Sequence, residues 1–273
     1  MPHFTKSHGL GNDYIVIDPR DVPFELTPER IRLICDRHRG VGSDGILVVG
    51  PADGDIFALR IFNPDGSEAE KSGNGVRIFA KYLREHGRTS QDRFTLRTLG
   101  GDVPVRLELE RGRVAYVTAD MGTPRFDDVR SIDVDGERIE VTSLSLGNPH
   151  CVVFVSDLAD VDVHALGPRI EGHPAFPAHT NVQFAQVTRR DEIRLEIWER
   201  GAGYTLASGS SSCAAVAAAF RKGLVDRQVT VVMPGGHLEI AVNDDGGLRM
   251  RGAVEEVLSG DFAPDVLARL GAR

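Results

Sequence analysis

The chain has 273 residues, of which 41% are hydrophobic and 26% charged, as in an ordinary soluble globular protein. Its length predicts one large or two medium domains. The formal net charge of -8, with no basic cluster, excludes a typical nucleic-acid or anionic-membrane partner and favours a small-molecule ligand.

The three cysteines, Cys35, Cys151 and Cys213, are far apart and odd in number. They form neither a disulfide framework nor a Cys/His metal-binding spacing, so we expect no metal and a reducing cytoplasm. The N-terminus has no apolar leader segment, and no stretch approaches the length of a membrane span. The sequence therefore predicts a cytoplasmic protein with no membrane contact.

The first half begins with a strand from Phe4, a Gly-rich loop through Asn12 and a β-rich run at 14–18. Thr27 and Pro28 predict the start of a helix that continues to about residue 37. A second Gly-rich loop at 40–45 precedes a strand, and a dinucleotide fingerprint would instead follow a strand into a helix. The remaining elements are strands at 46–49, 55–62, 94–98, 103–110 and 114–120 and a helix that begins at Val76 and ends near His86-Gly87.

The second half is predicted to follow a similar order, from a domain boundary near residue 121. Its strands are expected at 138–141, 143–146, 151–155, 180–185, 193–199, 229–233, 238–242 and 248–254, and its helices at 163–170, 214–220 and, at the C-terminus, 264–270. No segment is of low complexity.

Two Ser-Gly pairs, Ser72-Gly73 and Ser208-Gly209, each stand at the start of an apolar helix and lie 136 residues apart. Such a turn directs backbone N–H groups and the positive end of a helix dipole to one point, where an anion can bind. The serines are also natural N-caps. The repetition predicts two similar α+β halves related by a pseudo-twofold, with the site in the cleft between them. The expected domains are 1–121, joined by 256–273, and 122–255.

Six blocks carry a family resemblance. They are His8 to Asp13, Asn63 to Glu68, Gly73 to Gly75, Gly147 to His150, Thr180 to Val182, and Glu199 to Gly203. Their order and residues resemble diaminopimelate epimerase, over nearly the whole chain. The resemblance implies a PLP-independent isomerase with no cofactor, built from two pseudo-symmetric domains, each a barrel-like, mostly antiparallel sheet around a central helix. It also suggests a homodimer.

The resemblance further implies the substrate-binding groups. Asn63, Asn148, Asn181 and Arg200 would hold the distal carboxylate of a diamino diacid, and Glu199 its amino group. Asn12 and the N–H groups at Gly73-Asn74 and Gly209-Ser210 would surround the reacting α-carbon. Converging helix N-termini would stabilise the developing carbanion electrostatically, and Arg200 offers a bidentate fork for a carboxylate.

The catalytic positions depart from the family, where the resemblance implies a thiolate–thiol pair of cysteines. Here they are Ser72 and Ser208. A helix N-terminus can bring a thiol with a pKa of about 8.5 into range, whereas a serine hydroxyl needs an adjacent base. The family's Gly-Glu-Thr is also Gly203-Tyr204-Thr205 in this chain. Lys71 is a candidate base, although a surface lysine is the more common finding, and His8 and His150 are candidate proton shuttles.

The leading hypothesis is therefore α-carbon epimerisation of diaminopimelate (LL to meso) or a close relative, with Ser72 and Ser208 transferring the protons. One alternative is a different proton-shift isomerase that uses Lys71 or a histidine. A second is a catalytically silent amino-acid-binding homologue. The three cysteines are expected to be core residues.

Overall fold

The computed structural model describes residues 3–271, and its chain divides into two compact units. The first contains Met1–Thr118 and Ala253–Arg273, and the second Ala119–Gly252. The sequence predicts a domain boundary after residue 121, and the first segment of the first unit ends at Thr118. Both positions lie in strand β8 (Arg113–Gly122). In the part of the chain that the structure describes, no helix is long and apolar enough to cross a membrane.

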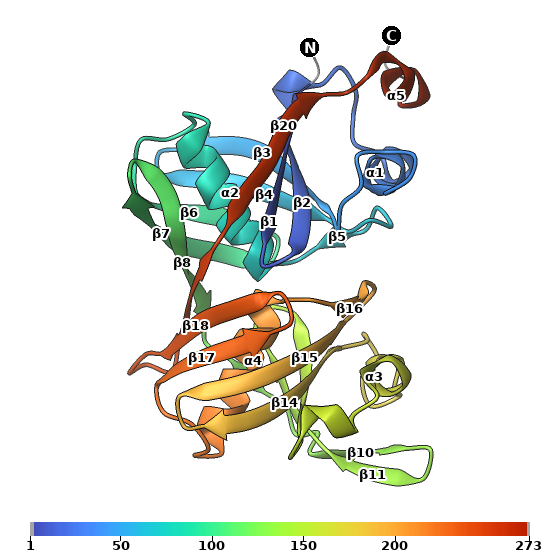
Figure 1. Ribbon diagram of the computed structural model, residues 1–273, viewed down its shortest axis with the longest axis vertical. Coiled ribbons are helices and arrows are strands. Elements are labelled where there is room, and N and C mark those ends of the chain that lie inside the picture. The colour runs from blue at the N-terminus through green and yellow to red at the C-terminus, as the bar shows by residue number, and fades with distance from the viewer. Residues whose placement is uncertain (1–2, 272–273) are drawn as a thin grey trace. The chain divides into compact units, whose positions relative to one another are not determined.

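The first unit is a sheet with a long helix packed inside it (Figure 1). Its helices are α1 (Pro28–Cys35), α2 (Gly73–Glu85) and α5 (Pro264–Arg269), with a 3-10 turn at Pro19–Asp21. Its strands are β1 (His3–Gly9), β2 (Asn12–Ile17), β3 (Ile46–Asp53), β4 (Ile56–Phe62), β5 (Glu68–Ala69), β6 (Arg93–Thr98), β7 (Gly101–Glu110), the start of β8 and β20 (Glu255–Asp261).

The second unit repeats this arrangement. Its helices are α3 (Val163–Glu171) and α4 (Gly209–Arg221), with a 3-10 turn at Leu158–Asp160. Its strands are β9 (Arg125–Phe126), β10 (Ser131–Val134), β11 (Glu137–Glu140), β12 (Thr142–Ser145), β13 (Pro149–Phe154), β14 (Asn181–Arg189), β15 (Glu192–Glu199), β16 (Gly203–Thr205), β17 (Gln228–Met233), β18 (Gly236–Val242) and β19 (Leu248–Ala253).

The strand register shows that the two units are copies of one design. In the first, β2 and β3 run parallel with Ile15 opposite Ile46. In the second, β13 and β14 run parallel with Cys151 opposite Val182, and both positions are 136 residues further along. The next, antiparallel pairs keep the same offset, because Ile46 faces Phe62 and Val182 faces Trp198. The predicted pseudo-symmetry is therefore present strand by strand.

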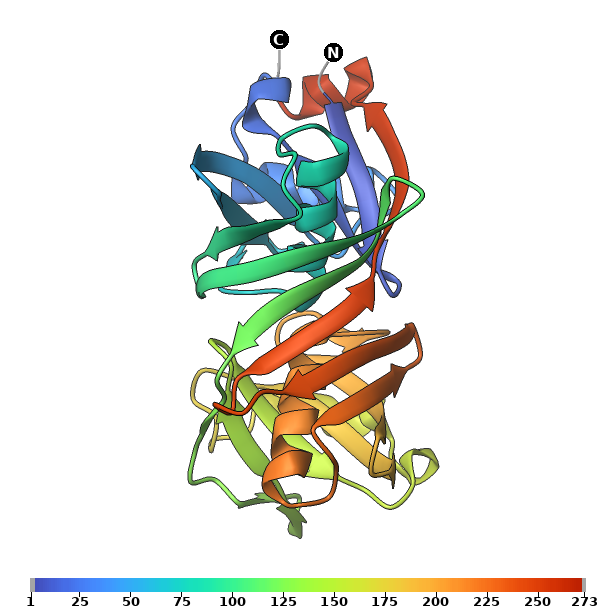
Figure 2. The same cartoon turned by 90° about the vertical axis from the view of Figure 1, so that its left-hand side faces the viewer.

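A buried helix fills each unit (Figure 2). Residues 73–83 of α2 and residues 209–219 of α4 are buried without interruption, so strands surround both helices. Small and apolar residues suit such a helix, but α2 also buries Arg77 and Lys81, whose charged groups donate hydrogen bonds to Asn74 and to the Val114 carbonyl. The alanine-rich run at 214–219 allows the sheet to approach α4 closely. This confirms the mostly antiparallel, barrel-like sheet around a central helix in each unit.

The structure differs from the sequence expectations at several element ends. Both central helices begin earlier than predicted, directly after their serine caps, because burial overrides the loop preference of the Gly-rich starts. Helix α1 ends at Cys35 rather than near residue 37, since the Asp36 carboxylate accepts the N–H groups of His38 and Arg39 and closes a turn. Strands β10 and β20 were not predicted. Strand β20 pairs antiparallel with β1.

Candidate active site

The predicted site residues fall into two clusters, one in each unit. The first cluster comprises Asn12, Asn63, Ser72, Gly73 and Asn74. The second comprises Asn148, Asn181, Glu199, Arg200, Ser208, Gly209 and Ser210.

Ser72 is the N-cap of α2 and is half-buried. Its backbone is extended, and its Oγ accepts the N–H of Gly75 at 3.0 Å. The helix's own bonding starts with the N–H of Val76, which donates to the Ser72 carbonyl. Gly73 and Asn74 therefore precede the first helical hydrogen bond, at the end of α2 where the dipole favours an anion.

The amides of Asn12 and Asn74 join the first strand loop to this helix. Asn74 Nδ2 donates to Asn12 Oδ1 at 3.0 Å, and Asn12 Nδ2 donates to Asp44 Oδ2 at 3.0 Å. The fully buried Arg77 donates to Asn74 Oδ1 at 2.9 Å. Each group on this chain fixes the rotamer of the next, so the two asparagines are positioned before any ligand arrives.

Ion pairs of Asp13 fix the position of the loop that carries Asn12. Lys6 Nζ and Arg37 Nη2 lie 2.9 and 2.8 Å from the Asp13 carboxylate. Burial acts to raise the pKa of Asp13, but hydrogen bonds from Arg37 and Lys6 outweigh it and lower the pKa. For the neighbouring Asp44, burial and the Asp13 charge raise the pKa. Arg37 thus bridges the two carboxylates, whereas Lys6 pairs with Asp13.

Asn63 lies apart from these contacts, in the turn after β4. It is half-buried, and its Nδ2 donates to Ser67 Oγ at 3.0 Å. The backbone N–H of Asn63 donates to the Ser67 carbonyl at 2.9 Å. These contacts are those of a turn residue, and they leave its proposed role as a ligand untested.

Ser208 caps α4 in the same manner as Ser72 caps α2, but it is buried, with 3% of its surface exposed. Its Oγ accepts the N–H of Ser211 at 3.4 Å, and its carbonyl accepts the hydroxyl of Ser212 at 2.8 Å. Gly209 and Ser210 precede the first helical bond, from the N–H of Ser212. Both serines are therefore N-caps, as the sequence indicates.

A buried polar network lies behind Ser208. Asn148 Nδ2 is 3.5 Å from Ser210 Oγ, and Asn148 Oδ1 is 3.0 Å from His150 Nε2. The other ring nitrogen, Nδ1, is 3.1 Å from Gln183 Nε2, which also donates to Ser211 Oγ at 3.0 Å. Burial and the charge of Arg200 lower the pKa of His150 to about 3, so the ring is neutral near pH 7. His150 therefore has a structural, hydrogen-bonded role and does not act as a proton shuttle near neutral pH.

The turn that carries Glu199 and Arg200 is held from two sides. Asn181 Oδ1 accepts the backbone N–H of Arg200 at 3.1 Å, and Asn181 Nδ2 donates to the Pro149 carbonyl at 2.8 Å. Glu171, at the end of α3, accepts the Trp198 indole N–H at 2.7 Å and the N–H of Gly201 at 3.0 Å. The Asn181 side chain thus contacts the Arg200 backbone, and the Arg200 guanidinium donates to the Ala178 carbonyl at 3.4 Å.

The two clusters match position by position. The Asn12–Asn74 contact and the Asn148–Ser210 contact each join residues 62 apart in the chain. Asn12 and Asn148 are themselves 136 residues apart, as are Asn74 and Ser210 and the two capping serines. Each unit therefore carries an asparagine from its first strand loop against the first turn of its central helix.

The cysteines do not replace the missing thiols. Cys35, Cys151 and Cys213 are all buried and unbridged. Burial raises the pKa of the Cys35 thiol to about 11, and it also raises the pKa of Cys151. Neither of these two thiols ionises near neutral pH, so they are core residues, as expected.

The structure also describes Lys71 and Tyr204, two residues near the serines in the sequence. Lys71 is 9% exposed, so the expectation of a surface lysine is wrong. Gly100 packs against it, since a Cβ there would lie 3.3 Å from the Lys71 Cβ. Tyr204, in the place of the family's glutamate, donates its hydroxyl to Glu196 at 2.7 Å. Burial and that hydrogen bond raise the pKa of Tyr204 to about 12, so it acts as a neutral donor.

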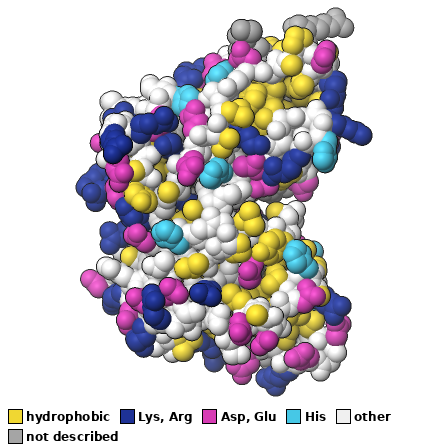
Figure 3. Space-filling view, viewed as in Figure 1, with side chains coloured by type: hydrophobic (Ala, Val, Ile, Leu, Met, Phe, Trp, Pro, Cys, Tyr) yellow, Lys and Arg dark blue, Asp and Glu magenta, His cyan; other side chains and the backbone are white. Residues whose placement is uncertain are grey.

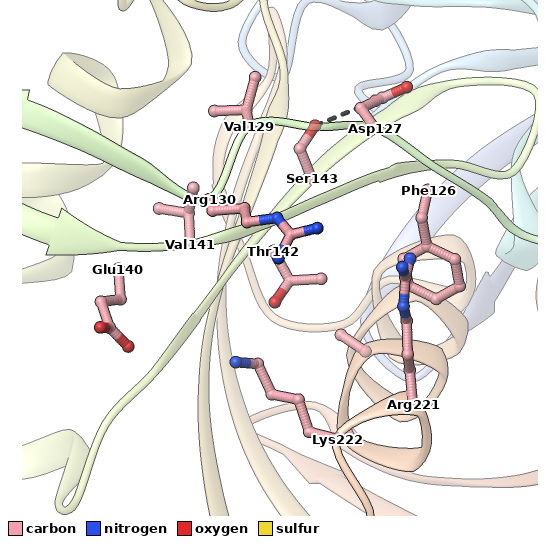
Figure 4. Close-up of a pocket in the computed structure, with 11 residues that line it drawn as sticks. Phe126, Asp127, Val129, Arg130, Glu140, Val141, Thr142, Ser143, Arg221 and Lys222 are labelled. Carbon is pink, nitrogen blue, oxygen red and sulfur yellow. Dashed lines mark hydrogen bonds between the residues drawn. The ribbon is translucent and has the colours of Figure 1, made fainter.

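A well-formed surface cavity of the second unit lies elsewhere (Figure 4). Its volume is about 350 Å³, and Arg221 and Lys222 at the far end of α4 line it, with the Arg221 guanidinium 4.2 Å from the centre of the Phe126 ring. None of the predicted site residues lines it. On the face that Figure 3 shows, acidic and basic side chains are interspersed.

Comparison with known proteins identifies the fold and the family. The profile of the family described as diaminopimelate epimerase matches residues 4–126 and 142–257. Diaminopimelate epimerase 2 of Nostoc sp. is 46% identical, with 97% of both chains covered. The diaminopimelate epimerase of Pelotomaculum thermopropionicum is 44% identical, over 95% of this chain and 98% of the relative. The chain belongs to the diaminopimelate epimerase family. It is accordingly an isomerase.

Solved structures of lower identity share the fold. A hydroxyproline epimerase from Agrobacterium vitis, with bound trans-4-hydroxy-L-proline, superposes with a TM-score of 0.78 at 16% identity, covering 96% of this chain and 92% of that one. A predicted epimerase from Pseudomonas aeruginosa gives a TM-score of 0.71 at 18% identity, covering 96% and 99%. Two-unit α+β architecture is thus common to the diaminopimelate epimerase family and these proteins.

Sequence reasoning missed several residues that build the clusters. Asp44 and Arg77 contact the predicted site residues Asn12 and Asn74, and Tyr14 contacts Ser72. Glu171 accepts the N–H of Gly201 next to Arg200, and Gln183 contacts Ser211 next to Ser210. Spacing gave no signal for these residues, since Asp44 and Gln183 are 139 residues apart and not 136. Their roles depend on contacts between segments that are distant in the chain.

Proposed function

We propose that this chain epimerises the α-carbon of an amino acid without a cofactor, and that its substrate is diaminopimelate (LL to meso) or a close relative. The observation that carries the proposal is the repeated serine cap. Ser72 and Ser208 occupy the same position at the N-termini of two equivalent 13-residue helices. Membership of the diaminopimelate epimerase family supports both the reaction class and the substrate.

The reaction needs one group to remove the α-proton from one face and another to deliver a proton to the other. In the proposal, Ser72 and Ser208 supply these two groups. The α-carboxylate would bind the N–H groups at Gly73-Asn74 and Gly209-Ser210, where helix dipoles offset the negative charge of the carbanion. Asn12 would orient it, since its amide oxygen accepts a hydrogen bond from Asn74 in the first turn of α2.

The distal carboxylate of the substrate would be bound by Asn63, Asn148, Asn181 and Arg200, and its amino group by Glu199. Arg200 suits a carboxylate because its guanidinium donates two parallel hydrogen bonds. The contact between Asn181 and the Arg200 backbone supports a shared role. Such a substrate is a small soluble molecule, and we place the enzyme in the cytoplasm.

Exchange of the α-proton in D₂O, followed by NMR over a panel of amino and diamino acids, tests this proposal. Deuterium should enter diaminopimelate with the wild-type protein, and Ser72→Ala and Ser208→Ala should reduce the rate by at least about 10²-fold. The double Ser→Cys variant should raise the rate, because thiols are far more acidic than serine hydroxyls. Tight binding of a compound from the panel, with no α-proton exchange in any of them, would contradict both enzymatic candidates and favour a catalytically silent binding protein.

A second candidate function has one observation in its favour. Lys71 is buried and is next to Ser72 in the chain. Lys71 could then act as the base of a different proton-shift isomerase, on a substrate with a more acidic C–H. Exchange that survives Ser72→Ala and Ser208→Ala but is lost in Lys71→Met would favour this candidate.

A further inference from the structure

The two serines do not have equivalent surroundings. The Tyr14 hydroxyl lies 3.1 Å from Ser72 Oγ, close enough for a hydrogen bond in either direction. In the second unit the position 136 residues further on is His150, whose ring nitrogens face Asn148 and Gln183 instead. Ser208 Oγ is paired with the N–H of Ser211.

The Tyr14 ring is closely packed and has little room to move. Tyr14 is 8% exposed and lies on β2, and Gly45 leads into the neighbouring strand β3. A Cβ at Gly45 would come within 2.7 Å of the Tyr14 ring and 2.5 Å of the Phe62 carbonyl oxygen. Only a glycine leaves room for the ring at this point, so the hydroxyl is directed at Ser72 by packing.

The chemistry of a serine acid explains what such a neighbour supplies. A phenol, with an ordinary pKa of about 10, is a much stronger acid than an aliphatic alcohol. Ser72 Oγ already accepts the Gly75 N–H at the positive end of a helix. When Ser72 loses its hydroxyl proton at this position, a second hydrogen-bond donor stabilises the resulting alkoxide and can supply a new proton to it.

We propose that Tyr14 is a positioning residue that exchanges a proton with Ser72. When the Ser72 O–H bond breaks and its proton goes to the substrate carbanion, the Tyr14 O–H bond breaks and its proton goes to Ser72 Oγ. The phenolate left on Tyr14 regains a proton from water. In the reverse direction, water takes the Tyr14 proton, Ser72 then removes the α-proton, and the Ser72 hydroxyl proton passes to the Tyr14 phenolate. The effective acid at this position is therefore a phenol. This relay rests on the proposed function.

The first test needs no substrate. A Ser72→Cys variant carries a thiol in place of the hydroxyl, and the pH dependence of its reaction with a disulfide reagent gives the thiol pKa. The native cysteines are buried and should react slowly. Adding Tyr14→Phe removes the donor to the thiolate and should raise that pKa by about one unit. Tyr82→Phe is the matched control, because that hydroxyl bonds Arg88. If adding Tyr14→Phe leaves the pKa of the introduced thiol in the Ser72→Cys variant unchanged, the Tyr14 hydroxyl does not contact the group at position 72.

The second test measures α-proton exchange in D₂O for wild type, Tyr14→Phe, Ser72→Ala and the double variant. Tyr14→Phe should lower kcat by about 10²-fold with little change in KM, and it should add nothing in the Ser72→Ala background. Additive losses, or wild-type exchange in Tyr14→Phe, would overturn the relay. No exchange by the wild-type protein would overturn the proposed function and the relay with it, while the thiol titration would still decide the contact.

Discussion

At the scale of the residue, each serine hydroxyl has two tasks. As an N-cap it accepts a backbone N–H of the first helical turn, and in the proposed reaction it also exchanges a proton with the substrate. A cap contributes about 1 kcal/mol to stability, whereas a proton-transfer group affects the rate by orders of magnitude. The two tasks can therefore be separated by experiment.

Ser208→Ala should lower the free energy of unfolding by about 1 kcal/mol and abolish α-proton exchange. Thr27→Ala removes a comparable cap from α1, where Thr27 Oγ1 accepts the N–H of Arg30 at 3.4 Å. It should cost similar stability and leave exchange intact. Urea unfolding and NMR exchange on both variants make the comparison. Equal exchange in the two variants would contradict a chemical role for Ser208.

The buried His150 predicts a specific acid sensitivity. Burial lowers its pKa to about 3 in the folded state, against about 6.5 in the unfolded chain. Between these two pH values His150 is protonated in the unfolded chain but not in the folded protein. The contribution of the neutral ring to the free energy of unfolding is therefore fully present above about pH 6.5 and is lost as the pH falls towards 3. The limiting slope is about 1.4 kcal/mol per pH unit.

Replacing this ring with a group that does not titrate should remove that contribution. His150→Gln should flatten the acid side of the stability profile, measured by urea unfolding from pH 7 to pH 4. The exposed His237, changed to Gln, is the matched control and should leave the slope unchanged. A profile for His150→Gln that stays parallel to wild type would contradict the neutral, buried ring.

At the scale of the element, the turn with Glu199 and Arg200 depends on how α3 packs on β15. Gly167 lies against Trp198, because a Cβ there would come within 2.7 Å of the indole Cγ. Glu171, one turn further along α3, accepts the indole N–H and the N–H of Gly201. A helix held this closely sets the position of the strand end and its turn.

Gly167→Ala should therefore destabilise the protein by about 1–3 kcal/mol, since the added methyl overpacks the contact. Gly172→Ala at the end of the same helix is the control, because its Cβ would meet nothing closer than 3.6 Å. Thermal unfolding compares the two. If α3 moves away from β15, Gly167→Ala should also weaken substrate binding. Equal melting temperatures would contradict the close packing.

At the scale of the whole molecule, the proposal requires residues of both units to bind one substrate. Asn63 belongs to the first unit and Arg200 to the second. A ligand present at about 100 times its Kd adds about 2.7 kcal/mol to the free energy of unfolding and should raise the melting temperature by about 5 °C.

Asn63→Ala and Arg200→Lys should each reduce the melting-temperature shift that diaminopimelate produces. Lysine keeps the charge of Arg200 but loses the bidentate fork. Gln91→Ala, an exposed amide in the first unit, should keep the full shift. Differential scanning fluorimetry with and without the ligand gives the answer. A shift lost in only one of the two variants would mean that a single unit binds the substrate.

Much of the fold followed from local patterns. The Ser-Gly pairs marked both central helices, and alternation of apolar residues marked most strands, because caps and periodicity act within a few residues. Strand β20 was missed, since its residues at 255–261 are mostly exposed and carry no clean alternation. Its place beside β1 depends on pairing with residues about 250 positions away.

The sequence by itself determined the family, the two similar halves and the serine pair, because motif residues and a constant offset of 136 are visible in the chain. Tertiary structure alone decided that Lys71 is buried and His150 neutral, and that the Tyr14 hydroxyl lies within hydrogen-bond distance of Ser72. These properties arise from desolvation and from contacts between distant segments. No local pattern records either of them. Each serine is a helix cap by its sequence, and its chemical environment is set by the fold.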